Sequence, residues 1–264
     1  MKWLFFLLPL SLFSAYIGNP ANPAIMNTGF FSSSYPFFKF TTGYIADYIS
    51  DKRYVAPQKD PDIDPNNAFR HFGLHSQLAS VSMIIVERLE LFGYVGGSKE
   101  HVQYRKKASL SDLEEIFSHF QSTYQFSWST GGRAILLQWG QTYFTTDFTY
   151  FAVPSSPKAF FKFLNRLNLP MDLTKQKTSL REWQVSAALA SRFLFFTPYF
   201  GGTYLHSRLH LSSGPDIPSI TYRNEKKWGY FFGFTVSLTG RFHLNFERRM
   251  RDEFAYAFST IAVF

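Results

Sequence analysis

The last segment of the chain is the feature that most constrains its fold. Residues 254–264 alternate large and small side chains and end on Phe264. Successive side chains of a strand point to opposite faces, so Phe254, Tyr256 and Phe258 share one face and small residues line the other. A soluble antiparallel strand can alternate in the same way, but its chain rarely ends on an aromatic residue. The pattern is typical of the closing strand of an outer-membrane β-barrel.

The composition agrees with this interpretation. Aromatic residues make up 20% of the chain, with 32 Phe and 15 Tyr, whereas charged residues make up only 17%. A transmembrane barrel places its apolar residues at alternate positions, so aromatic side chains crowd the lipid-facing surface while average hydropathy stays low. A net charge of +8 would also suit nucleic acid, but the arginines are spread along the chain and no motif of that class accompanies them. We therefore expect outer-membrane lipid, and no nucleic acid, as a partner.

The N-terminus has the features of an export signal. Residues 1–15 contain Lys2, a short apolar run and then small residues. The run is too short to span a bilayer as a helix, and we expect cleavage near Ser14 or Ala15. Residues 16–264 would then form one barrel domain in the bacterial outer membrane. The absence of cysteine excludes disulfides, a zinc-thiolate site and a lipid-modified N-terminal cysteine.

The spacing of alternating segments predicts the architecture. Short connections alternate with long ones, as the periplasmic turns and outer loops of a bacterial barrel do. We predict an all-β, antiparallel transmembrane β-barrel of about ten strands, or twelve if part of 105–121 or 212–226 also pairs. The ten expected strands are 36–49, 68–85, 89–104, 122–137, 140–153, 181–193, 196–211, 227–238, 241–249 and 254–264. Two short helices are expected in long loops, at 110–120 and 157–167.

The two faces of the clearer strands can be assigned. In the segment 241–249, Phe242 and Phe246 face one way, whereas His243 and Glu247 face the other. Lipid outside and water inside is the natural assignment, because an Arg or Lys on the lipid face near the midplane costs about 2–4 kcal/mol. The charged side chains that we expect to line the pore are Lys39, Asp47, Arg133, Asp147, Glu182, Arg192, Arg208, Arg241, Glu247 and Arg249. Six of these ten are basic, which favours anions weakly if the pore is open.

Five stretches in one order resemble a known family. The run Gly-Asn-Pro-Ala-Asn-Pro-Ala-Ile-Met at 18–26 resembles the mature N-terminus of the chlamydial major outer membrane porin. The other matching stretches are 87–92, 126–134, 182–190 with 196–201, and 249–253. The resemblance implies an outer-membrane barrel and a porin-like role. Members of that family are longer, wider and rich in cysteines that cross-link the envelope, so the disulfide-linked role is not carried over to this cysteine-free chain.

These observations leave two functions open. The first is a porin-like channel for passive diffusion of small hydrophilic solutes or ions. The alternative is a plugged structural or surface-interaction barrel, similar to an adhesin, because a ten-stranded lumen is narrow enough for side chains to fill. In both cases we expect the barrel-assembly machinery to recognise the strand that ends in Phe264. The sequence leaves homo-oligomerisation open.

Histidines give the only hint of other chemistry. His71 and His75 share a strand face, as do His206 and His210. Residues four apart on a strand are roughly 13 Å apart, too far to chelate one ion together. Serine, histidine and aspartate residues occur, but nothing in the sequence assembles them into a hydrolytic set. We therefore predict no metal, no cofactor and no enzymatic activity.

Overall fold

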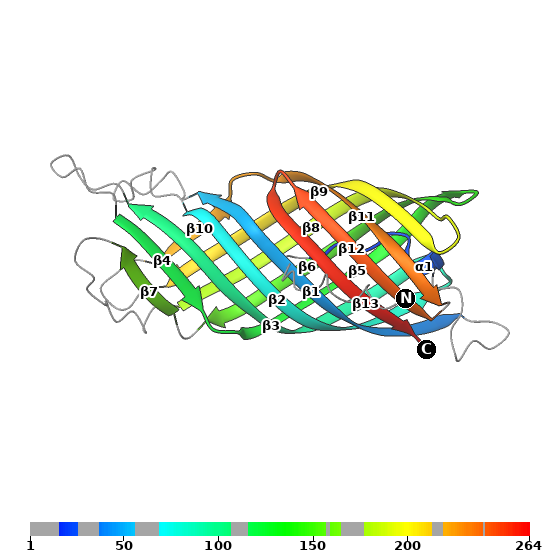
Figure 1. Cartoon of the computed structure of the whole chain (residues 1–264), viewed down its shortest axis with the longest axis horizontal. Helices are drawn as coiled ribbons and strands as arrows, with labels where there is room; N and C mark the ends of the chain where they lie inside the picture. The colour runs from blue at the N-terminus through cyan, green and yellow to red at the C-terminus, as the bar shows by residue number, and fades with distance from the viewer. Residues whose placement is uncertain are drawn as a thin grey trace, which may run out of the picture.

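The chain forms a closed β-barrel (Figure 1). The computed structural model describes residues 16–25, 37–55, 69–106, 116–156, 159–164, 177–212, 219–239 and 241–264. Ten strands make the wall, each antiparallel to its neighbours. In order around the ring they are β1 (Phe38–Val55), β2 (Phe69–Ile85), β3 (Leu89–Lys106), β5 (Gln125–Trp139), β6 (Thr142–Ser156), β8 (Lys177–Ser191), β9 (Phe196–Ser212), β11 (Trp228–Thr239), β12 (Phe242–Met250) and β13 (Glu253–Val263).

The first and last strands of the wall close the ring. β1 pairs with β13 from Thr41 opposite Val263 to Lys52 opposite Glu253. Each barrel strand also pairs with its sequence neighbour in the wall, so no wall strand is left with an open edge. The predicted number of ten strands is confirmed, as is the antiparallel barrel.

Three short strands extend the wall at the loop end of the barrel. β4 (Ile116–Ser122) pairs with β3 and with β7 (Ala159–Leu164), whereas β10 (Ile220–Asn224) bridges β1 and β9. Figure 1 shows β4 and β7 at the end opposite the C-terminus. The one helix among the described residues, α1 (Asn22–Ile25), lies elsewhere, near the turn end.

The prediction of two loop helices was wrong for those residues of the two segments that the structure describes. Within the expected 110–120 helix, Ile116 onward is strand β4, and within the expected 157–167 helix, Ala159–Leu164 is strand β7. The free edge of β3 beyond residue 100 offers backbone hydrogen-bonding groups to β4, and β4 in turn offers its edge to β7. Such tertiary pairing overrides a weak local helix propensity. The remaining parts of both segments lie outside the described residues.

The turns between strands are tight at one end. Val86 and Glu87 both have left-handed φ values, 52° and 56°, and connect β2 to β3. Two successive positive φ angles are the requirement of a two-residue turn whose twist matches that of the strands. The predicted turn at 138–139 lies two residues later, at Gly140, whose φ is 61°. Glycine adopts that conformation without steric cost.

Every strand of the wall carries apolar side chains on its outer face. Exposed examples are Phe40, Val81, Leu91, Phe126, Phe148, Val185, Phe200, Phe232, Phe246 and Phe254. Such a continuous apolar band would drive association in water, and it is the surface that a bilayer covers. Among the described residues no helix is long and apolar enough to cross a bilayer.

A belt of aromatic rings crosses five neighbouring strands on the outside, and we call it the aromatic girdle. Its members are Trp128, Tyr150, Trp183, Tyr204 and Trp228. Ring centroids are 5.4 Å apart for Trp128 and Tyr150, 5.6 Å for Trp183 and Tyr204, and 4.9 Å for Tyr204 and Trp228. Tyr150 lies directly opposite Trp183 in the register. Trp and Tyr are enriched at the interface between membrane and water, so the girdle marks one edge of the apolar band.

Candidate functional site

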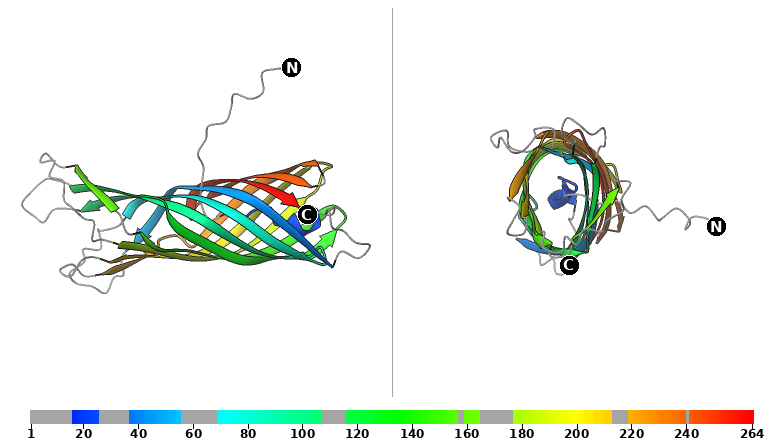
Figure 2. Two further views of the ribbon diagram at one scale, coloured as in Figure 1. Left: turned by 90° about the horizontal axis from the view of Figure 1, so that it is seen from below. Right: turned by 90° about the vertical axis from the view of Figure 1, so that its left-hand side faces the viewer.

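The lumen is occupied by the chain's own N-terminal segment, residues 16–25. In the end-on view of Figure 2 this segment, drawn in dark blue, lies inside the ring of strands. Every residue from Tyr16 to Pro23 is buried. The backbone N–H groups of Ile17 and Gly18 donate to the two carboxylate oxygens of Glu247, at 3.2 and 3.0 Å. One lumen carboxylate thus holds the start of the segment.

Further anchors come from strands around the ring. The Asn22 amide donates to both oxygens of Glu90 on β3, at 3.1 and 3.0 Å. The Glu90 carboxylate also pairs with Arg133 of β5 at 3.0 Å, and Arg133 donates to the Ile17 carbonyl. Because these partners sit on strands on different sides of the lumen, the segment is held from several directions.

Two hydroxyl contacts complete the seat of the segment. The Asn19 amide donates to the Thr235 hydroxyl on β11, and Ser259 of β13 donates to the Tyr16 hydroxyl at 2.7 Å. Gly18 has a φ of 78°, and a Cβ there would lie 2.8 Å from the Tyr16 ring. Only glycine fits both this left-handed backbone and this close approach.

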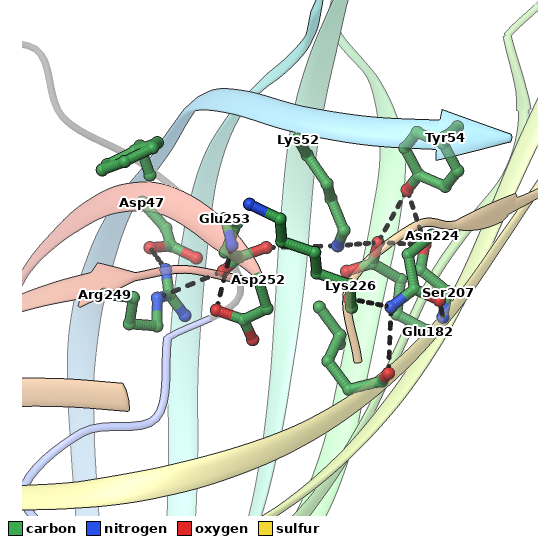
Figure 3. Close-up of polar contacts among 12 residues, drawn as sticks. Asp47, Lys52, Tyr54, Glu182, Ser207, Asn224, Lys226, Arg249, Asp252 and Glu253 are labelled. Carbon is green, nitrogen blue, oxygen red and sulfur yellow. Dashed lines mark hydrogen bonds and ion pairs between the residues drawn. The ribbon is translucent and has the colours of Figure 1, made fainter. Parts of the chain in front are cut away.

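A second group of charges closes the lumen nearer the loop end, and we call it the upper charge network (Figure 3). The Lys52 ammonium lies between Glu182, at 2.5 Å, and Glu253, at 3.1 Å. Arg249 pairs with Asp47 at 2.9 Å and with Glu253 at 3.3 Å. All five side chains are buried. The network therefore joins β1, β8, β12 and β13 across the interior.

Uncharged hydrogen bonds extend this network. The Tyr54 hydroxyl donates to Glu182 at 3.1 Å and lies 2.5 Å from the Ser207 hydroxyl. The Asn224 side chain accepts from the Ser207 backbone N–H at 3.0 Å. These contacts fix the Glu182 carboxylate, which compensates part of the cost of burying it.

The short outer turn between β12 and β13 carries one strongly perturbed acid. Asp252 is buried and accepts from the Glu253 backbone N–H at 2.9 Å. Burial, and next the charge of Glu253, raise the pKa of Asp252 to about 7, against the opposing effects of Lys52 and Arg249. Its carboxylate packs directly over Gly229, where a Cβ would collide with it.

Apolar side chains fill much of the remaining lumen. Residues in contact with one another there include Ile45, Ile49, Phe72, Leu74, Leu78, Phe92, Tyr94, Val102, Phe151, Val153, Leu180, Leu209 and Tyr222. Beside them, the hollow between Phe151, Glu182, Gln184 and Leu205 has no space for a water molecule. At this level of the barrel the described side chains therefore leave no water-sized gap.

Seven of the ten expected pore-lining residues lie buried inside the barrel: Lys39, Asp47, Arg133, Asp147, Glu182, Glu247 and Arg249. The other three require correction. Arg208 is exposed on the outer wall, because its neighbours Ser207 and Leu209 take the inward positions. Arg241 is exposed and Arg192 half-exposed, since both lie in turns that connect strands instead of within strands.

The correction changes the sign of the lumen charge. The buried cations are Lys39, Lys52, Arg133 and Arg249. The buried carboxylates are Asp47, Glu90, Glu100, Asp147, Glu182, Glu247, Asp252 and Glu253. Four cations against eight carboxylates make the described lumen acidic, whereas the expected set of residues was mostly basic.

The sequence interpretation missed Lys52 for two reasons: the expected strand ended at 49, whereas β1 runs on to Val55, and a bulge lies between. The register between β1 and β13 shifts between Ile49 and Asp51, which marks a bulge. An extra residue in a strand reverses the inward and outward positions beyond it. Lys52 and Tyr54 thus point inward, although strict alternation from Asp47 would place them outside. Glu90 and Glu100, by contrast, keep the alternation of β3 and could have been found from it.

The four histidines singled out from the sequence, and His101 beside them, lie on the outer wall. His71, His75 and His101 line a hollow of about 530 Å³ beside the β1 bulge, and His71 contacts Asp51 at 2.9 Å. His206 and His210 flank Arg208, also facing outward. Within the described ranges, no three His, Cys, Asp or Glu side chains are grouped so that they could hold a metal ion.

The geometry defines a closed, ten-stranded antiparallel β-barrel with an internal N-terminal segment. No protein-family model and no curated protein matches the sequence. Solved barrels do match: outer membrane protease OmpT from Escherichia coli, with 8% identity over 86% of this chain and 93% of that chain, has a TM-score of 0.40. The translocator domain of autotransporter NalP from Neisseria meningitidis has 9% identity, coverage of 90% and 88%, and a TM-score of 0.41.

A transporter is among the similar structures as well. The toluene transporter TbuX from Ralstonia pickettii has 9% identity over 93% of this chain and 90% of that chain, with a TM-score of 0.37. These proteins include a protease, a translocator domain and a transporter, so the likeness does not distinguish an enzyme from a channel. The function has to be argued from the chain's own residues.

Proposed function

We propose that this protein is an outer-membrane channel, porin-like in its polar lumen, that is held closed by its N-terminal segment. The observation that carries the proposal is the seating of residues 16–25 on lumen carboxylates and hydroxyls, notably Glu90 and Glu247. Hydrogen bonds of this kind can be exchanged for water when the segment leaves, although Ile17 and Ala21 also pack against apolar lumen residues that would then be exposed. The solutes would be small and hydrophilic.

Three features support an outer-membrane location. The apolar band surrounds the wall on all ten strands, the aromatic girdle borders it, and the strands are long enough to span a membrane. From Phe196 to Tyr204, β9 provides nine residues between the turn end and the girdle. A transmembrane strand needs about 9–11 residues. Export by a cleaved signal at residues 1–15 and recognition by the barrel-assembly machinery belong to the same proposal.

The polarity of the lumen favours a channel over a purely structural barrel. Burying charges is expensive, and well-packed apolar residues in place of a buried ion pair are often equally or more stabilising. A barrel that served only as a scaffold would gain nothing from twelve buried ionisable groups. The same groups would line a hydrated path once the segment has left. The acidic excess predicts that this path prefers cations.

The relation to the chlamydial porin family is part of the proposal and rests on the five collinear sequence stretches. The second candidate function, a plugged structural or surface-binding barrel, is favoured by the apolar cluster around Phe72 and Phe92, which also fills the lumen. The two candidates differ in what happens when the N-terminal segment is removed.

Single-channel conductance in planar bilayers separates them. We would compare refolded residues 16–264 with residues 26–264, from which the segment is deleted. The proposal predicts rare openings for the first protein and stable steps for the second, with a reversal potential in a salt gradient that indicates cations. A deleted protein that folds and is heat-modifiable but never conducts would support the structural barrel instead.

A reversible lock provides a matched control. The chain has no cysteine, so Asn19→Cys together with Thr235→Cys introduces the only two thiols, at positions whose side chains are in direct contact. The oxidised protein should stay closed and the reduced protein should open as the parent does. The single variant Asn19→Cys should not respond to oxidation; a response there would mean that the lock reports something other than the segment.

A further inference from the structure

A row of three arginines crosses the outer wall of the barrel. Arg181 of β8 lies directly opposite Arg208 of β9, and Arg208 lies directly opposite Arg223 of β10. All three side chains are exposed, whereas sequence neighbours such as Glu182 and Ser207 are buried. Since the faces of a strand alternate, the three guanidinium groups point away from the lumen at one level of the wall.

This arrangement is unfavourable by itself. Directly opposed residues on antiparallel strands have Cβ atoms about 4.5–5.5 Å apart, and like charges at such positions destabilise a sheet. Among the described residues, none of the three arginines forms an ion pair with a carboxylate, although Glu225 is exposed two residues beyond Arg223. The one polar contact within the row is from Arg208 Nε to His206 Nε2, at 3.1 Å.

Two more cations lie beside the row. Arg53 is exposed on β1, and its carbonyl accepts from the Glu225 N–H at 2.9 Å, next to β10. Lys227 is exposed, and its carbonyl accepts from the Leu205 N–H at 2.7 Å, next to β9. Lys226, next to Lys227, is exposed as well, so this side of the barrel carries six cations on neighbouring elements. The described part of the chain provides two carboxylates there, the exposed Glu225 and the half-buried Asp51.

The row lies just beyond the aromatic girdle, toward the loop end. Arg181 is two residues from Trp183, and Arg208 is four residues from Tyr204. At a rise of about 3.3 Å per residue these separations are roughly 7 and 13 Å along the strands. If the girdle lies at the membrane interface, the arginines lie at the height of the lipid headgroups of the outer leaflet.

We propose that the row of Arg181, Arg208 and Arg223 binds the phosphate groups of a phosphorylated glycolipid in the outer leaflet. A guanidinium group offers paired N–H donors that match phosphate oxygens, and several guanidinium groups in a line suit a headgroup with more than one phosphate. The row faces sideways into the membrane, so the occupant approaches from the lipid and its acyl chains lie against the girdle and the apolar band. The inference depends on the outer-membrane location proposed above, but not on conduction.

The test measures binding of a bisphosphorylated lipid A-type glycolipid to folded residues 16–264 in detergent micelles. The variant is R181Q/R208Q/R223Q, and the matched control is R88Q/R192Q/R241Q, which removes the same charge in the turns at the opposite end. The proposal predicts that the variant loses roughly tenfold or more of its affinity for the glycolipid and that the control loses less than about twofold. The dephosphorylated glycolipid should bind the unmodified protein as weakly as the phosphorylated lipid binds the variant.

Three results would overturn the inference: equal losses in the two triple variants, equal binding of the dephosphorylated lipid, or displacement by inorganic pyrophosphate at glycolipid-like concentrations, which would make free phosphate the ligand. If the triple variant fails to fold, R208Q alone removes the middle of the row and must still weaken binding. A barrel that binds the glycolipid but never conducts would contradict only the proposed channel. A barrel that conducts but does not bind the glycolipid would contradict only the proposal of glycolipid binding by the arginine row.

Discussion

Single residues in this barrel matter most where a charge is buried. Lys52 is the clearest case, because its ammonium group holds two carboxylates, those of Glu182 and Glu253, inside the wall. Lys39 has a similarly buried side chain, but its partner Glu87 has 40% of its side chain exposed. Losing the cation would leave Glu182 and Glu253 charged in a dry interior, whereas Glu87 could turn to water.

We therefore expect Lys52→Met to lower the free energy of unfolding by about 3–5 kcal/mol, as breaking a buried ion pair does. Lys39→Met should cost about 1 kcal/mol or less through its ion pair, because that pair is partly exposed. Urea unfolding in lipid vesicles, followed by tryptophan fluorescence, measures both. Equal losses for the two variants would mean that the upper charge network adds no stability of its own.

Asp252 gives a prediction about pH. Its pKa is raised from an ordinary 3.8 to about 7, so its ionised form is disfavoured in the folded state. Its contribution to stability is therefore complete below pH 4 and is lost as pH rises through 7. Asp252→Asn should stabilise the barrel relative to the parent at pH 8 and much less at pH 4. The midpoint temperature of heat modifiability, measured at both values, checks this; a difference independent of pH would contradict it.

Among the structural elements, the N-terminal segment is the one most dependent on backbone geometry. An alanine in the left-handed region costs about 1–2 kcal/mol, and at Gly18 its Cβ would also lie 2.9 Å from the Arg133 side chain. Gly140 has a similar φ of 61° but nothing within 4 Å of its Cβ position. The two glycines thus share the backbone strain and differ in their surroundings.

Gly18→Ala should loosen the segment, and Gly140→Ala should not. A reporter thiol placed by Ala21→Cys, at a fully buried position, would be labelled slowly by a maleimide in the parent. We expect labelling to be roughly tenfold faster with Gly18→Ala, which corresponds to about 1.4 kcal/mol. Unchanged labelling would show that the segment tolerates a side chain at position 18.

The barrel strands were predictable from sequence, because each carries a period-two pattern long enough to span a membrane. β9 was expected at 196–211 and runs from Phe196 to Ser212. What alternation cannot locate is a bulge, since the extra residue after Ile49 changes the face of Lys52 without any marker in the sequence. β7 was missed, and β4 was anticipated only as an alternative to a helix, because their strand conformation depends on the edge of β3 and not on their own residues.

The candidate site was predictable only in part. The run at 18–26 was singled out by its resemblance to a mature N-terminus, but no sequence pattern indicated that it enters the lumen. Its partners Glu90, Arg133 and Glu247 are far apart in the sequence and meet only when the ring has closed. Arg208 was assigned to the wrong face of its strand, because both faces of β9 carry polar residues and alternation alone does not show which face is inside.

At the scale of the whole molecule, the apolar band requires an apolar environment, such as the interior of a bilayer, around the barrel. Phe200 is 62% exposed on the outside of β9, within the band, whereas Ser219 is exposed at the loop end. In lipid vesicles Phe200→Arg should lower the unfolding free energy by about 2–4 kcal/mol, and Ser219→Arg by about 1 kcal/mol or less. Similar small effects for both would place Phe200 in water.

The anchors of the N-terminal segment come from both ends of the chain. Asn22 binds Glu90 on β3, whereas Tyr16 binds Ser259 on the last strand. In an open sheet β3 and β13 are many strands apart, so the seat is complete only after β13 has joined β1. Each newly made barrel must therefore exist for a time with a closed ring of strands but without the N-terminal segment bound, and binding of the segment is the last step of its assembly. Until residues 16–25 bind inside the lumen, solutes could pass through the open ring, and the duration of this leak depends on how quickly these ten residues bind.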